Sequence, residues 1–137
     1  MNYLTDLSVE LGGAVFKNPV MPASGTYDYF ENNADCFPVS ELGAVMIKSV
    51  HRLQRPGNPG PRIAEVCGGM LNCVGIPSVG IEAFLRDELP RYENIGTQVI
   101  LSISGSEPVH YAEIAELVGD DPRIAALEMN LSCPNVG

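Results

Sequence analysis

The stretch ALEMNLSCPNVG, residues 126–137, joins a short apolar run to a polar turn. The run ends in Asn130, and Cys133 is followed directly by Pro134, which disfavours helical backbone at the cysteine. A short and mostly apolar run is typical of a strand that is buried on both faces, as in a parallel sheet. The stretch therefore predicts a buried strand that delivers an amide and a thiol to the loop at its carboxyl end.

Three earlier runs have the same character as the run at Ala125–Met129. They span Val20–Ala23, Ala44–Ile47 and Val99–Ile103. A small or polar residue follows each of the four runs at its carboxyl end: Ser24, Lys48, Ser104 and Asn130. Parallel α/β folds build their active sites at this end of the sheet, so these positions indicate the functional face.

Helical periodicity fills the gaps between these runs. Apolar residues recur three and four positions apart in the segments 81–89 and 111–118, with Ser78 and Ser106 as the candidate N-caps. A weaker helix is expected within Phe30–Leu42. Strands that alternate with helices predict βα units and a parallel sheet.

Two segments depart from this alternation. Leu7–Glu10 and Ala14–Phe16 flank Gly12-Gly13, which predicts an N-terminal β-hairpin. Val50–Pro77 is long, rich in Gly and Pro, and has no clear period. A connection of this length inside a compact domain predicts a lid or a binding loop.

The fold that accommodates these elements is the first half of a barrel. A complete (β/α)₈ barrel needs about 250 residues, and here four strands use 137. We therefore expect an α/β fold that begins with the β-hairpin and ends in the loop after the fourth barrel strand, so that residues 1–137 form a single partial domain. A doubly wound sheet is the alternative, but no Gly-x-Gly-x-x-Gly follows the first strand.

Composition excludes several classes of function. The net charge of −9 argues against nucleic acid or an anionic membrane as the main partner. No apolar stretch reaches the roughly 20 residues that span a bilayer, and the N-terminus lacks the pattern of a secretory signal. The four cysteines form no C-x-x-C pair and the two histidines lie far apart. A cytoplasmic chain with reduced thiols and no metal site is expected.

A few polar residues are candidates for chemistry. Cys133 in its polar loop can reach a substrate as a base or nucleophile, although an incidental loop cysteine is the alternative. Asn72, Asn130 and Asn135 offer uncharged donors and acceptors for a heterocyclic ring, or they stabilise turns. Lys48 ends an apolar strand, where it either extends to solvent or faces an anionic ligand.

Several short motifs occur in a fixed order along almost the whole chain. They are Asn18-Pro19 to Gly25, Leu42-Gly43 to Lys48, Gly57-Asn58-Pro59 with Pro61-Arg62, Gly69-Met70-Leu71-Asn72, Val74-Gly75-Ile76, and Glu128 to Val136. Together they resemble the class 1 dihydroorotate dehydrogenases, and Gly-Met-Leu-Asn most resembles the class 1B branch. Each motif is weak alone, but the set closed by Asn-Leu-Ser-Cys-Pro-Asn-Val is highly specific.

The resemblance implies an FMN-bearing (β/α)₈ barrel that oxidises dihydroorotate to orotate in de novo pyrimidine biosynthesis. It implies that Cys133 removes the C5 proton while a hydride passes from C6 to FMN. The class 1B branch implies a partner subunit with FAD and a 2Fe–2S cluster that passes electrons to NAD⁺. A class 1A-like enzyme that passes electrons to fumarate is the alternative. Class 1 relatives also imply a homodimer of the full-length chain.

The resemblance also assigns binding residues. The flavin would be lined by Ala23, Ser24, Lys48, Ser49, Ser102 and Asn130. Dihydroorotate would be bound by Lys48, Asn72, Cys73, Val74, Gly75, Ile76, Asn130 and Asn135. No metal ligand is implied on this chain.

Some positions differ from the family pattern. The family usually has Asn where Ser78 and Ser102 stand, and Tyr27 and Tyr29 replace smaller or apolar residues near the entrance. Family members bind the FMN phosphate through late barrel loops, which would lie beyond Gly137. The isolated 137-residue chain is therefore not expected to bind FMN stably.

Two other functions remain as alternatives. One is a related flavin barrel that acts on another dihydropyrimidine, including dihydrouridine in RNA. The other is a non-catalytic half-barrel that needs a complementary chain. The acidic balance argues against an RNA substrate.

Overall fold

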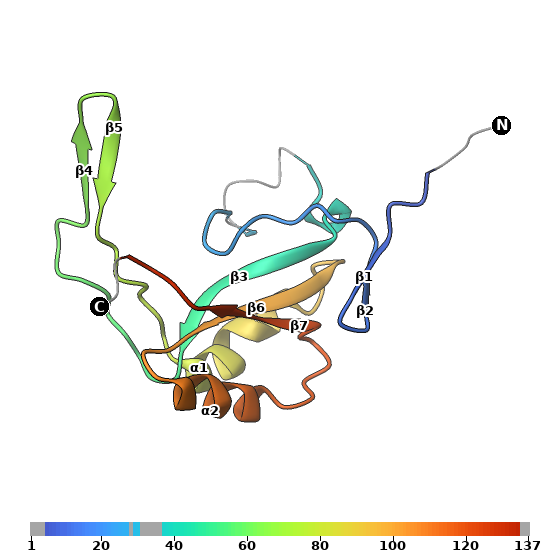
Figure 1. Ribbon diagram of the computed structural model, residues 1–137. Helices are drawn as coiled ribbons and strands as arrows, with labels where there is room; N and C mark the ends of the chain where they lie inside the picture. The colour runs from blue at the N-terminus through green and yellow to red at the C-terminus, as the bar shows by residue number, and fades with distance from the viewer. Residues whose placement is uncertain (1–4, 28, 31–36, 135–137) are drawn as a thin grey trace.

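Three of the predicted strands form one parallel sheet in the computed structural model, which describes residues 5–27, 29–30 and 37–134. The strand order is β3-β6-β7, with β3 at Ala44–His51, β6 at Gln98–Ser104 and β7 at Ala126–Asn130 (Figure 1). Both pairings are parallel. The α/β class and the parallel sheet are therefore confirmed.

The prediction of a strand at Val20–Ala23 is wrong. This segment lies against the start of β3, where Gly43 donates its N–H to the Val20 carbonyl at 2.9 Å. Further along β3, the Tyr29 hydroxyl takes the place of a neighbouring strand. It accepts the Met46 N–H at 2.9 Å and donates to the Met46 carbonyl at 3.2 Å. Because these backbone groups are already satisfied, they offer no pairing to the segment 20–23.

Helix α2 spans Pro108–Val118 and confirms the second predicted helix. Its N-cap is Glu107 and not Ser106. The backbone carbonyl of Glu107 accepts the N–H of His110 at 3.0 Å, and the Glu107 N–H donates to Nδ1 of His110 at 3.3 Å. The Ser106 hydroxyl instead lies 3.4 Å from Nδ1 of His110.

The first predicted helix is irregular. It consists of one α-helical turn, α1 at Ile81–Ala83, a π-helical stretch η2 at Phe84–Glu88, and a 3₁₀ turn η3 at Leu89–Tyr92. Its N-cap is Gly80 with φ of 87°, not Ser78 as expected. The weaker helix expected within Phe30–Leu42 lies partly outside the described residues, and its described part contains only the 3₁₀ turn η1 at Val39–Glu41.

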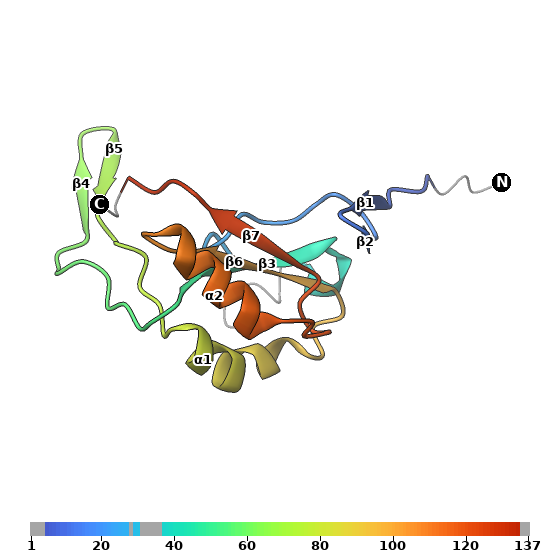
Figure 2. The same cartoon turned by 60° about the horizontal axis from the view of Figure 1, so that its bottom comes forward.

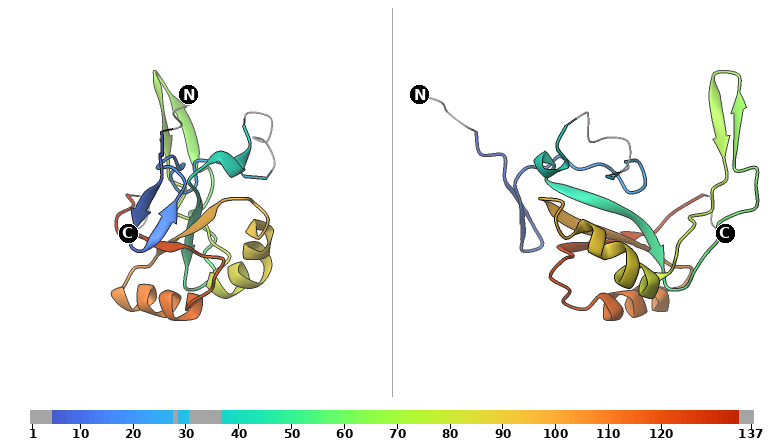
Figure 3. Two further views of the ribbon diagram at one scale, coloured as in Figure 1. Left: turned by 90° about the vertical axis from the view of Figure 1, so that its right-hand side faces the viewer. Right: turned by 180° about the vertical axis from the view of Figure 1, so that it is seen from behind.

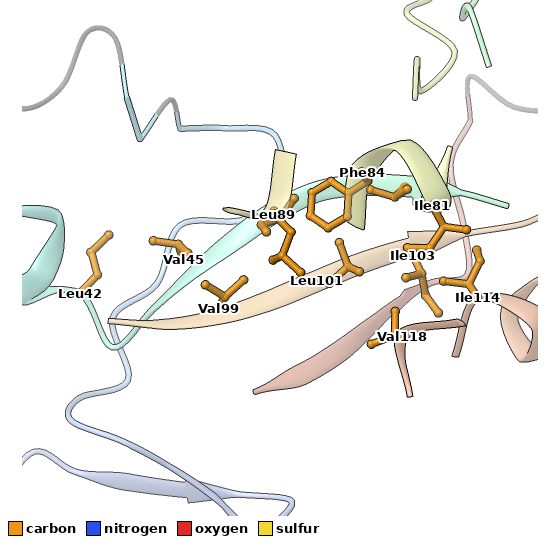
Figure 4. Close-up of a cluster of buried hydrophobic side chains, with 12 residues drawn as sticks. Leu42, Val45, Ile81, Phe84, Leu89, Val99, Leu101, Ile103, Ile114 and Val118 are labelled. Carbon is orange, nitrogen blue, oxygen red and sulfur yellow. The ribbon is translucent and has the colours of Figure 1, made fainter. Parts of the chain in front are cut away.

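Both helical segments cover the same face of the sheet (Figures 1 and 2). Figure 4 shows side chains from β3, β6, α1 and α2 meeting in one apolar cluster. Ile81, Leu101 and Ile114 in this cluster are wholly buried. Complete burial of such a side chain contributes about 1.5–3 kcal/mol, so this face holds the sheet and the helices together.

The predicted N-terminal hairpin is confirmed as β1 at Val9–Leu11 and β2 at Ala14–Phe16. Gly12 and Gly13 both have positive φ, 59° and 86°, as a two-residue hairpin turn requires. Phe16 is wholly buried against Ala44 and Ile100 on the face of the sheet opposite the helices. The hairpin thereby covers the amino-terminal part of the sheet (Figure 1).

The segment Val50–Pro77 contains a second hairpin that the sequence analysis did not predict. Strands β4 at Ile63–Val66 and β5 at Gly69–Asn72 pair antiparallel, and every residue of both strands is exposed. Figure 3 shows that this hairpin stands away from the sheet on the side of its carboxyl ends.

Among the described residues, no helix is long and apolar enough to cross a membrane.

Candidate functional site

Three polar side chains meet at the carboxyl ends of the three parallel strands. The hydroxyls of Ser49 on β3 and Ser102 on β6 lie 2.9 Å apart. The amide Nδ2 of Asn130, the last residue of β7, donates to Ser49 Oγ at 3.1 Å. Ser49 is 1% exposed and Ser102 is 0% exposed, so water does not compete for these hydrogen bonds. Residues that are far apart in the sequence thus form one hydroxyl–amide cluster.

An irregularity in β3 produces this arrangement. Ile47 pairs with Leu101 and Val50 pairs with Ile103, so two residues of β3 stand opposite Ser102 alone. Those two residues are Lys48 and Ser49. A β-bulge of this kind re-aims the side chains next to it, and here Ser49 is buried while Lys48 is exposed.

Tyr111 holds the backbone at the end of β7. Its hydroxyl lies 2.6 Å from the Asn130 carbonyl and 3.1 Å from the Gly105 carbonyl, so it fastens β7 to the loop after β6. In the apolar spacing of the segment 111–118, Tyr111 counts only as an apolar position. Its phenol was the available signal, because a tyrosine on the buried face of a helix needs a partner for its hydroxyl.

Lys48 lies beside a cavity of about 220 Å³ at the exposed edge of β3. Gly25 approaches Lys48 so closely that a Cβ at position 25 would overlap the lysine side chain. Tyr27 and Tyr29 also line this cavity, with their ring centroids 5.2 Å apart. Burial raises the pKa of Tyr29 above the ordinary value, so its hydroxyl stays protonated and keeps its bonds to β3. Tyr27 and Tyr29 therefore shape the surroundings of Lys48.

The segment that follows β5 is fastened to the loop before β4. Asn58 donates its side-chain N–H to the Cys73 carbonyl at 3.3 Å, and its backbone N–H to the Val74 carbonyl at 3.1 Å. Arg55 Nε donates to the Gly75 carbonyl at 2.8 Å. The carbonyls of residues 73–75 are thus engaged within the protein.

Asn58 and Gly75 fit closely against each other. A Cβ on Gly75, whose φ is 77°, would lie 2.6 Å from the Asn58 side chain, so glycine is required at this position. Asn58, from the Gly-Asn-Pro motif, thereby fastens the base of the second hairpin. We call Arg55 and Asn58, with their bonds to residues 73–75, the hairpin latch.

The remaining predicted site residues lie at or near the same end of the sheet. Ala23 is exposed and Ser24 is half-buried, in a turn that Thr26 closes by donating to the Ala23 carbonyl. Ile76 is buried with a positive φ of 44°, whereas Asn72 is exposed at the end of β5. Val74 is half-buried between them.

Cys133 is a half-buried free thiol three residues after Asn130. The segment 131–134 runs from β7 toward the base of the second hairpin in all views (Figures 1, 2 and 3). Asn135, the last predicted site residue, lies outside the described residues. The structure therefore places the thiol and the Asn130 amide at one end of the sheet.

His51 is the last residue of β3 and lies close to this end. Burial lowers its pKa, and the positive charges of Arg55, His110 and Lys48 lower it further. His51 is therefore neutral at pH 7, and its buried Nε2 has no hydrogen-bond partner among the residues that the structure describes. Within the same residues, no group of three His, Cys, Asp or Glu side chains is placed to hold a metal ion.

Comparison with known proteins gives one consistent family. The model of the dihydroorotate dehydrogenase family matches residues 6–137. The catalytic subunit of dihydroorotate dehydrogenase B (NAD(+)) from Pelobacter propionicus is 45% identical over 131 residues, which cover 96% of this chain and 43% of that subunit. The corresponding subunit from Geobacillus kaustophilus is 45% identical over 130 residues and is covered to 42%. The chain thus spans less than half the length of these relatives.

A solved structure supports the same assignment. The crystal structure of DHODH from Eimeria tenella in complex with ferulenol superposes with a TM-score of 0.64 and 25% sequence identity. The superposition covers 96% of this chain and 38% of that one, as expected for the first part of a barrel. The expected fold, a partial (β/α)₈ barrel preceded by a hairpin, is therefore confirmed. With a family model that matches nearly its whole length, this chain belongs to the dihydroorotate dehydrogenase family.

Proposed function

We propose that the protein that carries this chain oxidises dihydroorotate to orotate with bound FMN. The observation that carries the proposal is the convergence of Lys48, Asn130 and Cys133 on the carboxyl end of one parallel sheet. The names of the relatives in Pelobacter and Geobacillus support the same substrate. Sites at this end of the sheet are the rule for barrel enzymes.

The residues present suit a flavin. A flavin ring presents alternating N–H and carbonyl groups, which an asparagine amide and serine hydroxyls can match. Asn130, Ser49 and Ser102 offer such groups in a buried cluster, and Lys48, the residue before Ser49 on β3, carries an exposed ammonium that can balance negative charge. When bound, FMN would supply the acceptor for the hydride that leaves C6 of the substrate.

The chain's own residues would then perform two tasks. Cys133 Sγ would take the proton from C5 of dihydroorotate, since a carbon next to a carbonyl is deprotonated by a positioned base. Lys48 would pair with the substrate carboxylate. The segment 72–76 would form a wall of the pyrimidine site. The hairpin latch engages the carbonyls of residues 73–75, and the Cys73 N–H donates to the Arg62 carbonyl, so backbone contacts to the ring would come from the N–H groups of residues 74–76.

The relatives' names also support a particular electron acceptor. Both are catalytic subunits of an NAD(+)-dependent enzyme. We therefore include in the proposal a partner subunit with FAD and a 2Fe–2S cluster that passes electrons to NAD⁺, and a homodimer of the catalytic chain. The cytoplasmic location that the cysteine pattern predicts also belongs to the proposal.

The test uses the full-length natural polypeptide that carries this sequence. Under anaerobic conditions, dihydroorotate should bleach the flavin absorbance of the wild-type protein. Cys133→Ala should slow this bleaching by a factor on the order of 10²–10⁴, as expected when a general base is removed, with flavin still bound. Cys67→Ala is the matched control, because Cys67 is an exposed free thiol in the turn of the second hairpin.

Each other outcome has a distinct meaning. Near-normal bleaching in Cys133→Ala would remove Cys133 from the role of base. A wild-type protein that dihydroorotate does not bleach, but dihydrouracil does, would favour the related flavin barrel. A full-length protein that binds no flavin would favour the non-catalytic half-barrel.

A further inference from the structure

The hydroxyl–amide cluster is unusual for its place in the sheet. Ser102 stands in β6 among Val99, Ile100, Leu101 and Ile103, which are all buried apolar side chains. A hydroxyl buried in such surroundings costs free energy unless it is hydrogen-bonded. The contact of Ser102 with Ser49, at 2.9 Å, provides that bond. Ser49 and Ser102 therefore stand as a hydrogen-bonded pair at two buried positions where apolar side chains would otherwise be expected.

The direction of the bonds follows from the donors. Asn130 Nδ2 donates to Ser49 Oγ, and either hydroxyl of the Ser49–Ser102 pair can donate to the other. We take Ser49 as the donor, because its own hydrogen is free while its oxygen accepts from Asn130. Without Ser102, the Ser49 hydroxyl could donate its hydrogen to Asn130 Oδ1 instead. That bond would favour the amide turned by half a rotation, with Oδ1 facing Ser49. Ser102 thus selects the amide orientation in which nitrogen faces Ser49 and Oδ1 faces away from it.

The backbone of Asn130 is fixed separately. Tyr111 donates its hydroxyl to the Asn130 carbonyl at 2.6 Å, and Ser104 is the register partner of Asn130 in β6. The remaining freedom of Asn130 is therefore the orientation of its side-chain amide. The Ser49–Ser102 pair restricts that freedom.

We propose that Ser102 is a positioning residue that acts through Ser49, holding the Asn130 amide so that Oδ1 accepts a ring N–H from the bound ligand. The ring N–H belongs either to the flavin or to the pyrimidine. This inference rests on the proposed function for the identity of the ligands. It gives a role to Ser102, the position at which this chain departs from the family's asparagine.

The experiment compares Ser102→Ala with Ser104→Ala in the full-length natural polypeptide. Ser104 is buried two residues further along β6 and lies outside the cluster, so its variant is a matched control. Loss of one oriented hydrogen bond corresponds to about a fivefold change in affinity. We expect Ser102→Ala to raise the dissociation constant of FMN or of orotate about fivefold, and Ser104→Ala to leave both within twofold, a margin of about 0.4 kcal/mol. The constant that rises identifies the source of the N–H.

A double-mutant cycle separates positioning from packing. If Ser102 acts through Asn130, Ser102→Ala should have no further effect on the affected constant in an Asn130→Ala background. A packing role would persist in that background. Should Ser102→Ala not fold, Ser49→Ala breaks the same cluster from β3 and is expected to raise the same constant.

Two results overturn the proposal. One is a Ser102→Ala protein whose FMN and orotate constants both match those of Ser104→Ala. The other is an effect of Ser102→Ala that is undiminished in the Asn130→Ala background. Failure of the proposed function would look different, because a wild-type protein without dihydroorotate oxidation still has an FMN dissociation constant on which the cluster can be tested.

Discussion

The two β-hairpins of this chain have similar local construction and opposite surroundings. In β1–β2 the turn is Gly12-Gly13, and in β4–β5 it contains Gly68 with φ of 73°. The first hairpin buries Phe16 completely against the sheet, whereas the second exposes every residue of both strands. The hairpin latch holds the second hairpin at its base. Turn chemistry makes a hairpin, but burial decides whether it stabilises the fold or serves the site.

The largest expected effect of a single change is on the first hairpin. Phe16→Ala should lower the free energy of unfolding by about 3–5 kcal/mol, because it leaves a cavity between the hairpin and the sheet. Urea denaturation of the full-length natural polypeptide measures this. Val15→Ala is the control on the same strand, since Val15 is 57% exposed. A loss in Phe16→Ala no larger than in Val15→Ala would remove the structural role of this hairpin.

A smaller and local effect is expected at the hairpin latch. Asn58→Ala removes the side-chain bonds to the Cys73 carbonyl and Sγ, at 3.3 and 2.9 Å. Amide hydrogen exchange in the segment 69–76 should accelerate about fivefold, as for the loss of one hydrogen bond. Exchange in β3 should stay unchanged. Equal acceleration in both segments would mean that the latch stabilises the whole fold and not only the second hairpin.

The smallest effect is expected on the strands of the second hairpin. Ile63 on β4 is 58% exposed, and Ile63→Thr keeps a β-branched side chain. The free energy of unfolding should change by no more than about 0.5 kcal/mol. A loss above about 2 kcal/mol in the full-length polypeptide would show that this strand is covered there, which would erase the contrast between the two hairpins.

The same contrast explains what could be predicted. Gly12-Gly13 between two short strand-like runs is a strong local signal, so the first hairpin was predicted correctly. The second hairpin lies in a segment rich in Gly and Pro, and its four-residue strands have no buried face that would impose a period of two. For Val20–Ala23, a strand was predicted that the structure does not contain. This segment has the pattern of a strand, but Tyr29 occupies the backbone groups of Met46 on β3.

The candidate site divides in the same manner. Asn130 was predicted at the carboxyl end of a strand, and it is the last residue of β7. The predicted strand end at Lys48 is wrong, since β3 continues beyond Lys48 to His51. Both residues still lie toward the carboxyl ends, which parallel strands share as one functional edge. Their partners were not predictable, since Ser49 meets Asn130 across 81 positions and Tyr111 meets it across 19. The chemical role of a single residue can be predicted from its type and its position in the sequence. Contacts between distant residues depend on strand register and side-chain packing.

The sequence by itself determined the class of fold, the functional end of the sheet and the family, because apolar periodicity and ordered motifs are local properties of the chain. Only the tertiary structure decided that β3 carries an irregularity opposite Ser102, that Tyr29 closes the edge of β3, and that Tyr111 fastens β7. Those features follow from which backbone and hydroxyl groups find partners once strands are paired, and a pairing exists only when the chain has folded.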